Sequence, residues 1–297
     1  MAERRYYRVA EHVFSIEAPE KMFAPLTNYE HFRVWDTPSE VQFSLTIGIA
    51  PLDTENREHV YTDTSEDEMP RIEVYRVRQN WLFCIAISKN APVCSRMLTT
   101  PDFRQAWLEI DTTQTTFAIN NAAMLLYAFS TANLYTLEMH AAVAVRQGRG
   151  YLFLGKSGTG KSTHAQQWFK AFDDAWLLND DNPILRLYEQ DGRSRVIVYG
   201  SPWSGKTPCY KNVSVEVGSI VKLAQAPHNK ARRLRLPEAY AYMLSSASGL
   251  KVVPEVMDAL YLTISRMIQT VPLFALECLP DTDAAQVCWQ AVTGVQD

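Results

Sequence analysis

The N-terminal part of the chain alternates short apolar runs with polar, turn-forming segments, a pattern that favours β-strands over amphipathic helices. Strands are predicted at residues 12–16 and 41–49, with a loop-like segment, 25–36, between them. The polar, acidic stretch 53–70 has the composition of a long surface loop. We therefore expect a β-rich first region.

A hairpin is predicted at the end of that region. Residues 71–77 open with polar–apolar alternation, and the apolar run 81–87 follows the turn-forming pair Gln79-Asn80. Two strand-like segments joined by a short turn pair as antiparallel neighbours. The region shows no pattern of catalytic residues, and its role is left open.

The pattern changes at about residue 112. Residues 111–116 are rich in side chains that cap helices, and the apolar stretch 117–134 is rich in helix formers. A largely buried helix is predicted there. We therefore divide the chain into a β-rich N-terminal domain, residues 1–112, and a second domain, residues 113–297.

The second domain begins with a strand pattern. Apolar runs at 139–145 and 150–154 predict a hairpin whose second strand leads into a glycine-rich loop. After the loop, Ala165, Trp168 and Phe172 recur with the spacing of one helix face. The order strand, loop, helix, strand is that of an α/β domain that can bind phosphate.

The loop sequence at 155–162, GKSGTGKS, matches the P-loop pattern G-x-x-x-x-G-K-[ST] at every fixed position. Glycines and small residues let successive backbone N–H groups turn inward around phosphate oxygens, and the following helix directs its positive end at the anion. The predicted nucleotide-binding residues are Gly155, Lys156, Ser157, Gly158, Thr159, Gly160, Lys161, Ser162 and Thr163.

Two side chains of this loop carry specific chemistry. Lys161 would place a positive charge against the β- and γ-phosphates, and Ser162 would offer its hydroxyl to Mg²⁺. The sequence therefore predicts a nucleoside triphosphate, ATP, bound together with magnesium.

Two adjacent carboxylates end the next predicted strand, 175–181. P-loop enzymes need an acidic group near this point to hold the metal ion. We expect Asp180 and Asp181 at the metal, and we assign Asp181 the further task of accepting the proton of an acceptor hydroxyl. The alternative is a turn built from ordinary turn-forming residues.

Other candidates lie on either side of the aspartates. His140 belongs to the strand that leads toward the loop, where a lone histidine is either a core residue or a site residue. Arg186 follows the aspartate pair closely in the segment 182–186.

The segment 200–206, GSPWSGK, follows a predicted strand at 196–199. Ligands of α/β sheets bind at the carboxyl ends of strands, so we expect this segment beside the γ-phosphate. Lys206 would then stabilise the transferring phosphoryl group or hold an acidic part of the acceptor, and Trp203 would line the site. Both residues fit a rigid turn equally well.

Composition and charge exclude some classes of protein. The 297 residues are 47% hydrophobic and 21% charged, which is typical of a globular chain with room for two cores. A net charge of −4 argues against binding to nucleic acid. The dense basic run 230–235 is either a solvated surface segment or a site for phosphate or an acidic partner.

The sequence also indicates the compartment. We expect no secretory signal and no membrane span, because no apolar run has the necessary length. The five cysteines are scattered, without a C-x-x-C pair, which favours free thiols in a reducing cytoplasm. Assembly into a homo-oligomer is left open.

Three segments together, MHAA at 139–142, LGKSGTGKST at 154–163 and LNDD at 178–181, resemble the catalytic domain of HPr kinase/phosphorylase. ATP-dependent phosphoenolpyruvate carboxykinase shares this core. The resemblance covers about residues 135–297, and the segment 200–206 looks like the uncharacterised HPr kinase-related proteins. The resemblance implies an active centre formed by His140, Lys161, Ser162, Asp180 and Asp181.

The sequence departs from the HPr kinases at three points. Ala141 stands where they usually have glycine, and Thr163 where they usually have glutamate. Their C-terminal arginine–proline–glycine stretch has no counterpart that we find. These differences argue against HPr itself as the acceptor.

The pattern and the resemblance together predict an ATP-dependent kinase that transfers the γ-phosphate to a hydroxyl group, either a serine of a protein or peptide or a small metabolite. Two alternatives stay open: a nucleotide-binding regulatory module without turnover, and phosphoryl transfer of the carboxykinase type.

Overall fold

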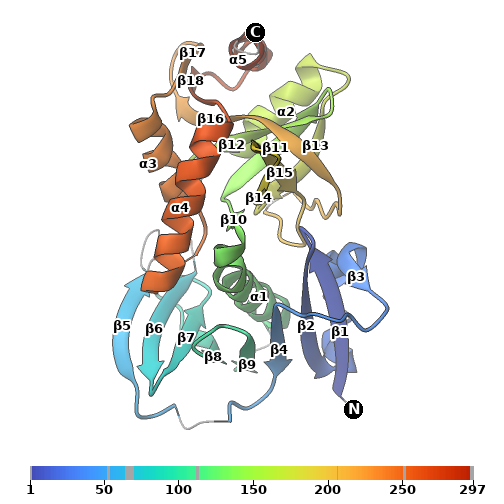
Figure 1. Cartoon of the computed structure of the whole chain (residues 1–297), viewed down its shortest axis with the longest axis vertical. Coiled ribbons are helices and arrows are strands. Elements are labelled where there is room, and N and C mark those ends of the chain that lie inside the picture. The colour runs from blue at the N-terminus through green and yellow to red at the C-terminus, as the bar shows by residue number, and fades with distance from the viewer. Residues whose placement is uncertain are drawn as a thin grey trace. The chain divides into compact units, whose positions relative to one another are not determined.

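The computed structural model describes residues 2–51, 54–63, 70–111, 114–205, 207–249 and 252–294. The chain forms two compact units, Met1–Thr131 with Gly249–Met257, and Ala132–Ser248 with Asp258–Asp297. Thr112 and Thr113, where the sequence pattern places a domain boundary, lie outside the described residues. The protein is a mixed α/β chain with two large sheets (Figure 1).

The first unit is built on a sheet with the strand order β3-β1-β2-β4-β9-β8-β7-β6-β5. Its pairs are antiparallel except β2–β4 and β4–β9, which are parallel. The strands are β1 (Ala2–Val9), β2 (His12–Pro19), β3 (Arg33–Val34), β4 (Phe43–Ile47), β5 (Glu58–Asp63), β6 (Arg71–Val77), β7 (Asn80–Ala86), β8 (Val93–Thr99) and β9 (Gln105–Ile110). Two short 3-10 helices, η1 (Glu20–Met22) and η2 (Thr27–Phe32), link β2 to β3.

The predicted strands at 12–16 and 41–49 are confirmed as β2 and β4, and the predicted hairpin is confirmed as β6 paired with β7. The loop expected at 53–70 is wrong in part, because it contains β5, which pairs with β6 at the edge of the sheet. An edge strand keeps polar, exposed side chains, so its sequence resembles a loop. Residues 53 and 64–69 lie outside the described residues.

The helix predicted at 117–134 is confirmed as α1 (Thr115–Thr131), which continues into a 3-10 turn, η3 (Ala132–Leu134). Its alanine and leucine side chains are mostly buried, as a helix packed on a sheet requires. The Tyr127 hydroxyl donates a hydrogen bond of 3.0 Å to the Val9 carbonyl, and Phe129 stacks on Phe83. These contacts join α1 to the sheet of the first unit.

The second unit contains the other sheet, with the strand order β10-β14-β15-β16-β12-β11-β13 and with β18 joined to β16 and β17. Its strands are β10 (Thr136–Glu138), β11 (Ala141–Arg146), β12 (Arg149–Leu154), β13 (Trp176–Asp181), β14 (Ile184–Gln190), β15 (Arg193–Tyr199), β16 (Ser214–Gln225), β17 (Lys230–Arg233) and β18 (Leu273–Cys278). Its helices are α2 (Lys161–Ala171), α3 (Leu236–Ser246), α5 (Thr282–Thr293) and the part of α4 (Pro254–Thr270) from Asp258 onward.

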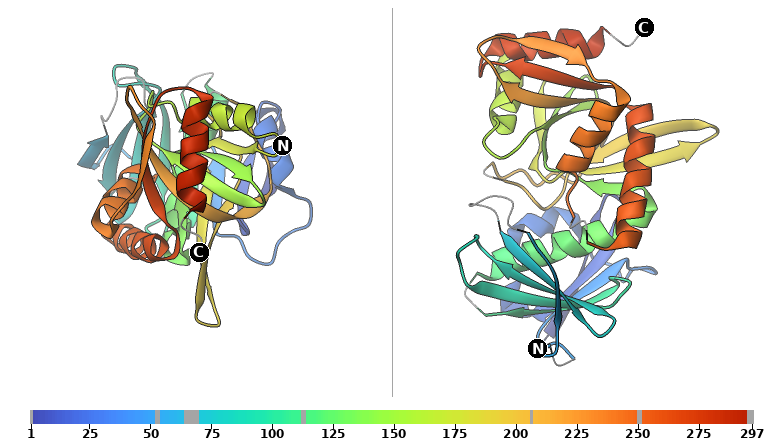
Figure 2. Two further views of the ribbon diagram at one scale, coloured as in Figure 1. Left: turned by 90° about the horizontal axis from the view of Figure 1, so that it is seen from above. Right: turned by 90° about the vertical axis from the view of Figure 1, so that its left-hand side faces the viewer.

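Helices cover both faces of this second sheet (Figure 2). On one face, Ala142 and Ala144 of β11 pack in a cluster with α2 and α5. On the other face, Val143 and Val145 pack in a cluster with α3 and α4. A strand buried on both faces has a continuous apolar sequence, which is why the runs at 139–145 and 150–154 show no alternation.

The predicted hairpin is confirmed as β11 paired with β12, and the glycine-rich loop is followed by α2 and then β13. The basic run 230–235 forms β17 and the residues before α3, where Arg232 pairs with Glu238 at 2.7 Å. Within the described part of the chain, no helix combines the length and the apolar character needed to cross a membrane.

Candidate functional site

The strand order brings three segments together at the beginning of β11. In the sheet, Ala141 lies between Leu154, the last residue of β12, and Asp181, the last residue of β13. His140 directly precedes Ala141 in the chain. The glycine-rich loop, the aspartates and the histidine therefore meet at one edge of the sheet because β12 and β13 both run antiparallel to β11.

The glycine-rich loop, residues 155–160, connects β12 to α2 through a tight backbone turn. Gly158 and Gly160 have φ angles of +76° and +101°, a left-handed conformation that favours glycine. A Cβ atom on Gly155 would lie 2.9 Å from the Thr159 side chain. The glycines at these positions are thus required by the shape of the loop itself.

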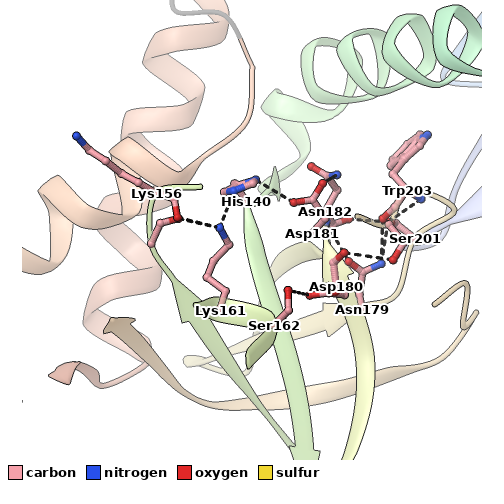
Figure 3. A network of polar contacts seen from close by, with 12 residues as sticks. His140, Lys156, Lys161, Ser162, Asn179, Asp180, Asp181, Asn182, Ser201 and Trp203 are labelled. Atoms are coloured by element: carbon pink, nitrogen blue, oxygen red, sulfur yellow. Dashed lines mark hydrogen bonds and ion pairs between the residues drawn. The ribbon is translucent and has the colours of Figure 1, made fainter. Parts of the chain in front are cut away.

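Lys161 is the first residue of α2 and is 9% exposed. Its ammonium group donates to the carbonyl of Gly155 at 2.9 Å and to that of Lys156 at 3.4 Å, and it lies 2.7 Å from Nε2 of His140. The positive charge is held at the glycine-rich loop rather than in solvent (Figure 3).

Ser162 and Asp180 are joined by a hydrogen bond of 2.7 Å from the serine hydroxyl to Oδ1 of the aspartate. Asp180 is 3% exposed, and its other oxygen, Oδ2, has no hydrogen-bond partner among the described residues. A buried carboxylate with one bare oxygen costs several kcal/mol unless a cation lies beside it. The pair therefore has the character of a cation ligand set.

The donors fit Mg²⁺ rather than a transition metal. The described residues hold no group of three or more histidine, cysteine or acidic side chains that could bind a metal ion. Mg²⁺ is usually held by one or two carboxylates, with water and phosphate oxygens completing the shell. The Ser162 hydroxyl and the Asp180 carboxylate meet that smaller requirement.

Asp181 faces a different partner. Its Oδ1 lies 3.1 Å from Nδ1 of His140, and its side chain is 33% exposed. A neutral imidazole that carries its proton on Nδ1 satisfies both neighbours, because it donates to Asp181 and accepts from Lys161. The result is a chain of contacts from ammonium to imidazole to carboxylate (Figure 3).

The geometry of β13 explains why adjacent aspartates have different neighbours. Successive side chains of a strand point to opposite faces, and paired residues on neighbouring strands share a face. Asp180 pairs with Ala142, on the face that α2 covers, whereas Asp181 pairs with Ala141 on the opposite face. Asp180 thereby meets Ser162 of α2.

Residues 179–182, here called the aspartate turn, are held by side chains that lie elsewhere in the sequence. The Asn179 side chain donates to the Ser201 hydroxyl and to the Trp203 carbonyl, and it accepts from the Asn182 backbone. Asp181 has a φ angle of +144°, a strained conformation for a residue other than glycine, which costs about 1–3 kcal/mol. Sequence reasoning missed this network, since nothing local links residue 179 to residue 201.

The segment predicted to lie near the site, 200–206, does contact the aspartate turn through its described residues. The Gly205 N–H donates to the Asp180 carbonyl at 2.5 Å, and Ser204 forms a β-bridge with Asp181. Trp203 is 1% exposed, which fits its alternative role as part of a turn scaffold. Lys206 lies outside the described residues.

Two buried titratable residues near these elements were also missed. Glu138, at the end of β10, is 2% exposed, and neither carboxyl oxygen has a hydrogen-bond partner among the described residues. Burial, together with the charge of Asp181, raises its pKa well above the ordinary value. Burial lowers the pKa of His164, on α2, to about 4. From sequence alone, a single acidic residue or histidine among apolar residues cannot be assigned to a functional site or to the core.

Arg186, the other candidate, lies on β14 with its guanidinium carbon 4.9 Å from the centre of the Tyr188 ring.

A further contact to the glycine-rich loop comes from Gln225, whose side chain donates to the carbonyl of Gly158 at 3.2 Å. That residue ends β16, the parallel neighbour of β12, and so supports the loop from the adjacent strand.

Comparison with known proteins gives only a weak structural likeness. No family model matches the chain, and no curated protein matches it. Among solved structures, it is similar to the Hpr(Ser) kinase/phosphatase from Coxiella burnetii, with 13% identity and a TM-score of 0.32. The match covers 54% of this chain and 99% of the other. At that score the likeness supports no conclusion about fold or chemistry.

Proposed function

We propose that this protein is an ATP- and magnesium-dependent phosphotransferase that moves the γ-phosphate to a hydroxyl group. One observation carries the proposal: a glycine-rich loop, a buried lysine and two carboxylates with different partners converge at one edge of the second sheet. The acceptor would be a serine of a protein or peptide, or a small hydroxylated metabolite.

Nucleotide binding rests on the glycine-rich loop and on Lys161. The backbone N–H groups of the loop and the amino end of α2 would donate to phosphate oxygens. The ammonium group of Lys161 is already positioned at the loop and needs only to exchange carbonyl partners for phosphate oxygens. Phosphate would thus be bound by groups that the fold holds ready.

Magnesium would be held by Ser162 and Asp180, whose bare Oδ2 is the free acceptor that the ion requires. When bound, the ion would neutralise charge on the phosphates. Because Asp180 is buried, its carboxylate has little freedom to turn away. We therefore assign Asp180 to the metal.

Asp181 is assigned to proton transfer. A base must be accessible to the acceptor, and Asp181 is a third exposed whereas Asp180 is buried. His140 holds Asp181 by one ring nitrogen and contacts Lys161 through the other, so the imidazole fixes the distance between the base and the phosphate-binding lysine. Phosphoryl transfer asks mainly for such positioning and charge neutralisation.

The test is transfer of labelled γ-phosphate. Purified protein, Mg²⁺ and γ-labelled ATP are added to an undialysed extract of the source cells, which keeps its small metabolites, and labelled proteins and small molecules are isolated. Protein carrying Asp181→Asn, purified in the same way, controls for contaminating kinases. Label that enters one component only with the wild-type protein supports the proposal. Tight binding of ATP without any such label would instead make the chain a binding module.

A further inference from the structure

Asn179 lies one residue before the aspartate pair and is fully buried, with 0% exposure. Both N–H groups of its amide are within reach of acceptors, the Ser201 hydroxyl at 3.2 Å and the Trp203 carbonyl at 3.1 Å. Its oxygen accepts from the backbone N–H of Asn182 at 3.0 Å. One side chain therefore holds both the far side of the aspartate turn and a separate segment of the chain.

Ser201 completes this arrangement and is equally buried. Its hydroxyl lies 2.6 Å from the Asn182 carbonyl and accepts from the Trp203 N–H at 3.2 Å. The amide of Asn179 and the hydroxyl of Ser201 are thus fully occupied by each other and by backbone groups. We call these two side chains the Asn179–Ser201 clamp (Figure 3).

The clamp ends next to the reacting groups. Beyond Trp203, the Gly205 N–H reaches the Asp180 carbonyl, and Ser204 bridges Asp181. The approach is close enough that a Cβ atom on Gly205 would lie 3.1 Å from the Asp180 carbonyl oxygen. The backbone of both aspartates is therefore fixed from the side, including the strained conformation of Asp181.

We propose that Asn179 and Ser201 are positioning residues, which hold Asp180 toward Ser162 and Asp181 toward His140. The inference rests on the proposed function. Neither side chain touches the groups that would react, so the clamp acts through the backbone of the aspartate turn. A displacement of about 1 Å in a catalytic group lowers a rate by about a hundredfold, which sets the scale of the expected effect.

The variants are Asn179→Ala and Ser201→Ala, measured in the full chain. Asn28→Ala is the matched control, because Asn28 is a buried asparagine of the first unit whose amide donates to Asn120 at 3.2 Å. Each variant is measured for kcat and for the KM of ATP in the transfer assay. Amide exchange at Gly205 is followed at residue resolution in the same proteins.

We expect kcat to fall by about a hundredfold in Asn179→Ala, with the KM of ATP within about threefold of wild type, because the glycine-rich loop is untouched. Gly205 should lose protection from exchange. The double variant should be hardly worse than the more affected single variant, since both side chains belong to one clamp. Asn28→Ala should keep both kcat and Gly205 protection.

A kcat in Asn179→Ala equal to that of Asn28→Ala would overturn the positioning role, and so would an equal loss through the KM of ATP alone. Unchanged protection of Gly205 would overturn the clamp itself. If the wild-type protein transfers no phosphate, the proposed function fails, and exchange at Gly205 still decides whether the clamp fixes the turn. Ser201→Ala carries the same test if Asn179→Ala does not fold.

Discussion

The glycine-rich loop and the aspartate turn meet at the same sheet edge but are built in different ways. In the loop, backbone conformation does the positioning, with glycines at left-handed φ angles and Lys161 folded onto carbonyls six and five residues before it. In the aspartate turn, buried side chains do the positioning, and Asn179 is held by Ser201, 22 residues later.

Because they are built differently, the two regions should contribute differently to ligand binding and to the reaction rate. In the proposed function the loop would surround an anion, and Gly158 and Gly160 cannot be replaced without strain because of their left-handed φ angles. The aspartate turn instead sets the direction of two carboxylates. The positions of these carboxylates depend on contacts with residues that are distant in the sequence. Variants in the loop should therefore abolish binding, whereas variants in the turn should lower rates.

The largest effect is expected from Lys161→Ala. The change removes the ammonium group that α2 places against the carbonyls of the glycine-rich loop, so transfer should fall by about a thousandfold and ATP binding should be severely weakened. Transfer kinetics and nucleotide titration measure the two losses. Lys170→Ala, an exposed lysine near the end of the same helix, is the control and should behave as wild type. Normal turnover of MgATP by Lys161→Ala would show that the loop does not bind the nucleotide.

Substitutions of the two aspartates should have different effects. Asp180→Asn removes the buried charge beside Ser162, so activity should require more Mg²⁺ and recover in part when the ion is raised. Asp181→Asn removes the base, so the rate should fall by about a hundredfold or more at every Mg²⁺ concentration. Initial rates over a range of Mg²⁺ measure both. Equal behaviour of the two variants would contradict the assignment of separate roles.

A smaller effect is expected from His140→Gln. Glutamine can contact Lys161 or Asp181 but cannot bridge them as the ring does, so kcat should drop by about tenfold. The KM of ATP should change little. His228→Gln provides the control, because His228 is an exposed histidine that also pairs with a carboxylate, that of Glu277. A kcat unchanged in His140→Gln would make the histidine a structural residue.

The sequence predicts the elements that local patterns determine, and it does not predict those that depend on contacts between distant residues. The glycine-rich loop, α2 and the hairpin before it could be predicted because their signals are local: periodicity, glycine spacing and a lysine at a fixed offset. The strand β5 could not, since an edge strand has a polar sequence. Asn179 and Glu138 could not either, because their importance arises from burial and from partners brought together by the sheet.

The smallest effect on activity, and a clear one on stability, is expected from Glu138→Gln. Burial, together with the charge of Asp181, raises the pKa of this carboxyl in the folded protein well above its value in the unfolded chain, so the folded state holds its proton more tightly. Glu138 therefore favours folding at low pH, and this contribution is lost as pH rises above the unfolded pKa of about 4.3.

Glu138→Gln removes that titration, so the stability of the variant relative to wild type should be higher at pH 7 than at pH 4. Urea unfolding at the two pH values measures the difference. An identical pH dependence in both proteins would show that Glu138 is ionised or hydrated in the folded state.

We propose that the glycine-rich loop and the Ser162–Asp180 pair bind a nucleoside triphosphate with magnesium. The most direct test is calorimetric titration of the wild-type protein with ATP, with and without Mg²⁺. We predict one site per chain, with affinity at least about tenfold weaker when Mg²⁺ is withheld, because the ion links the phosphates to Asp180. Absence of binding at millimolar MgATP, or affinity indifferent to Mg²⁺, would contradict it.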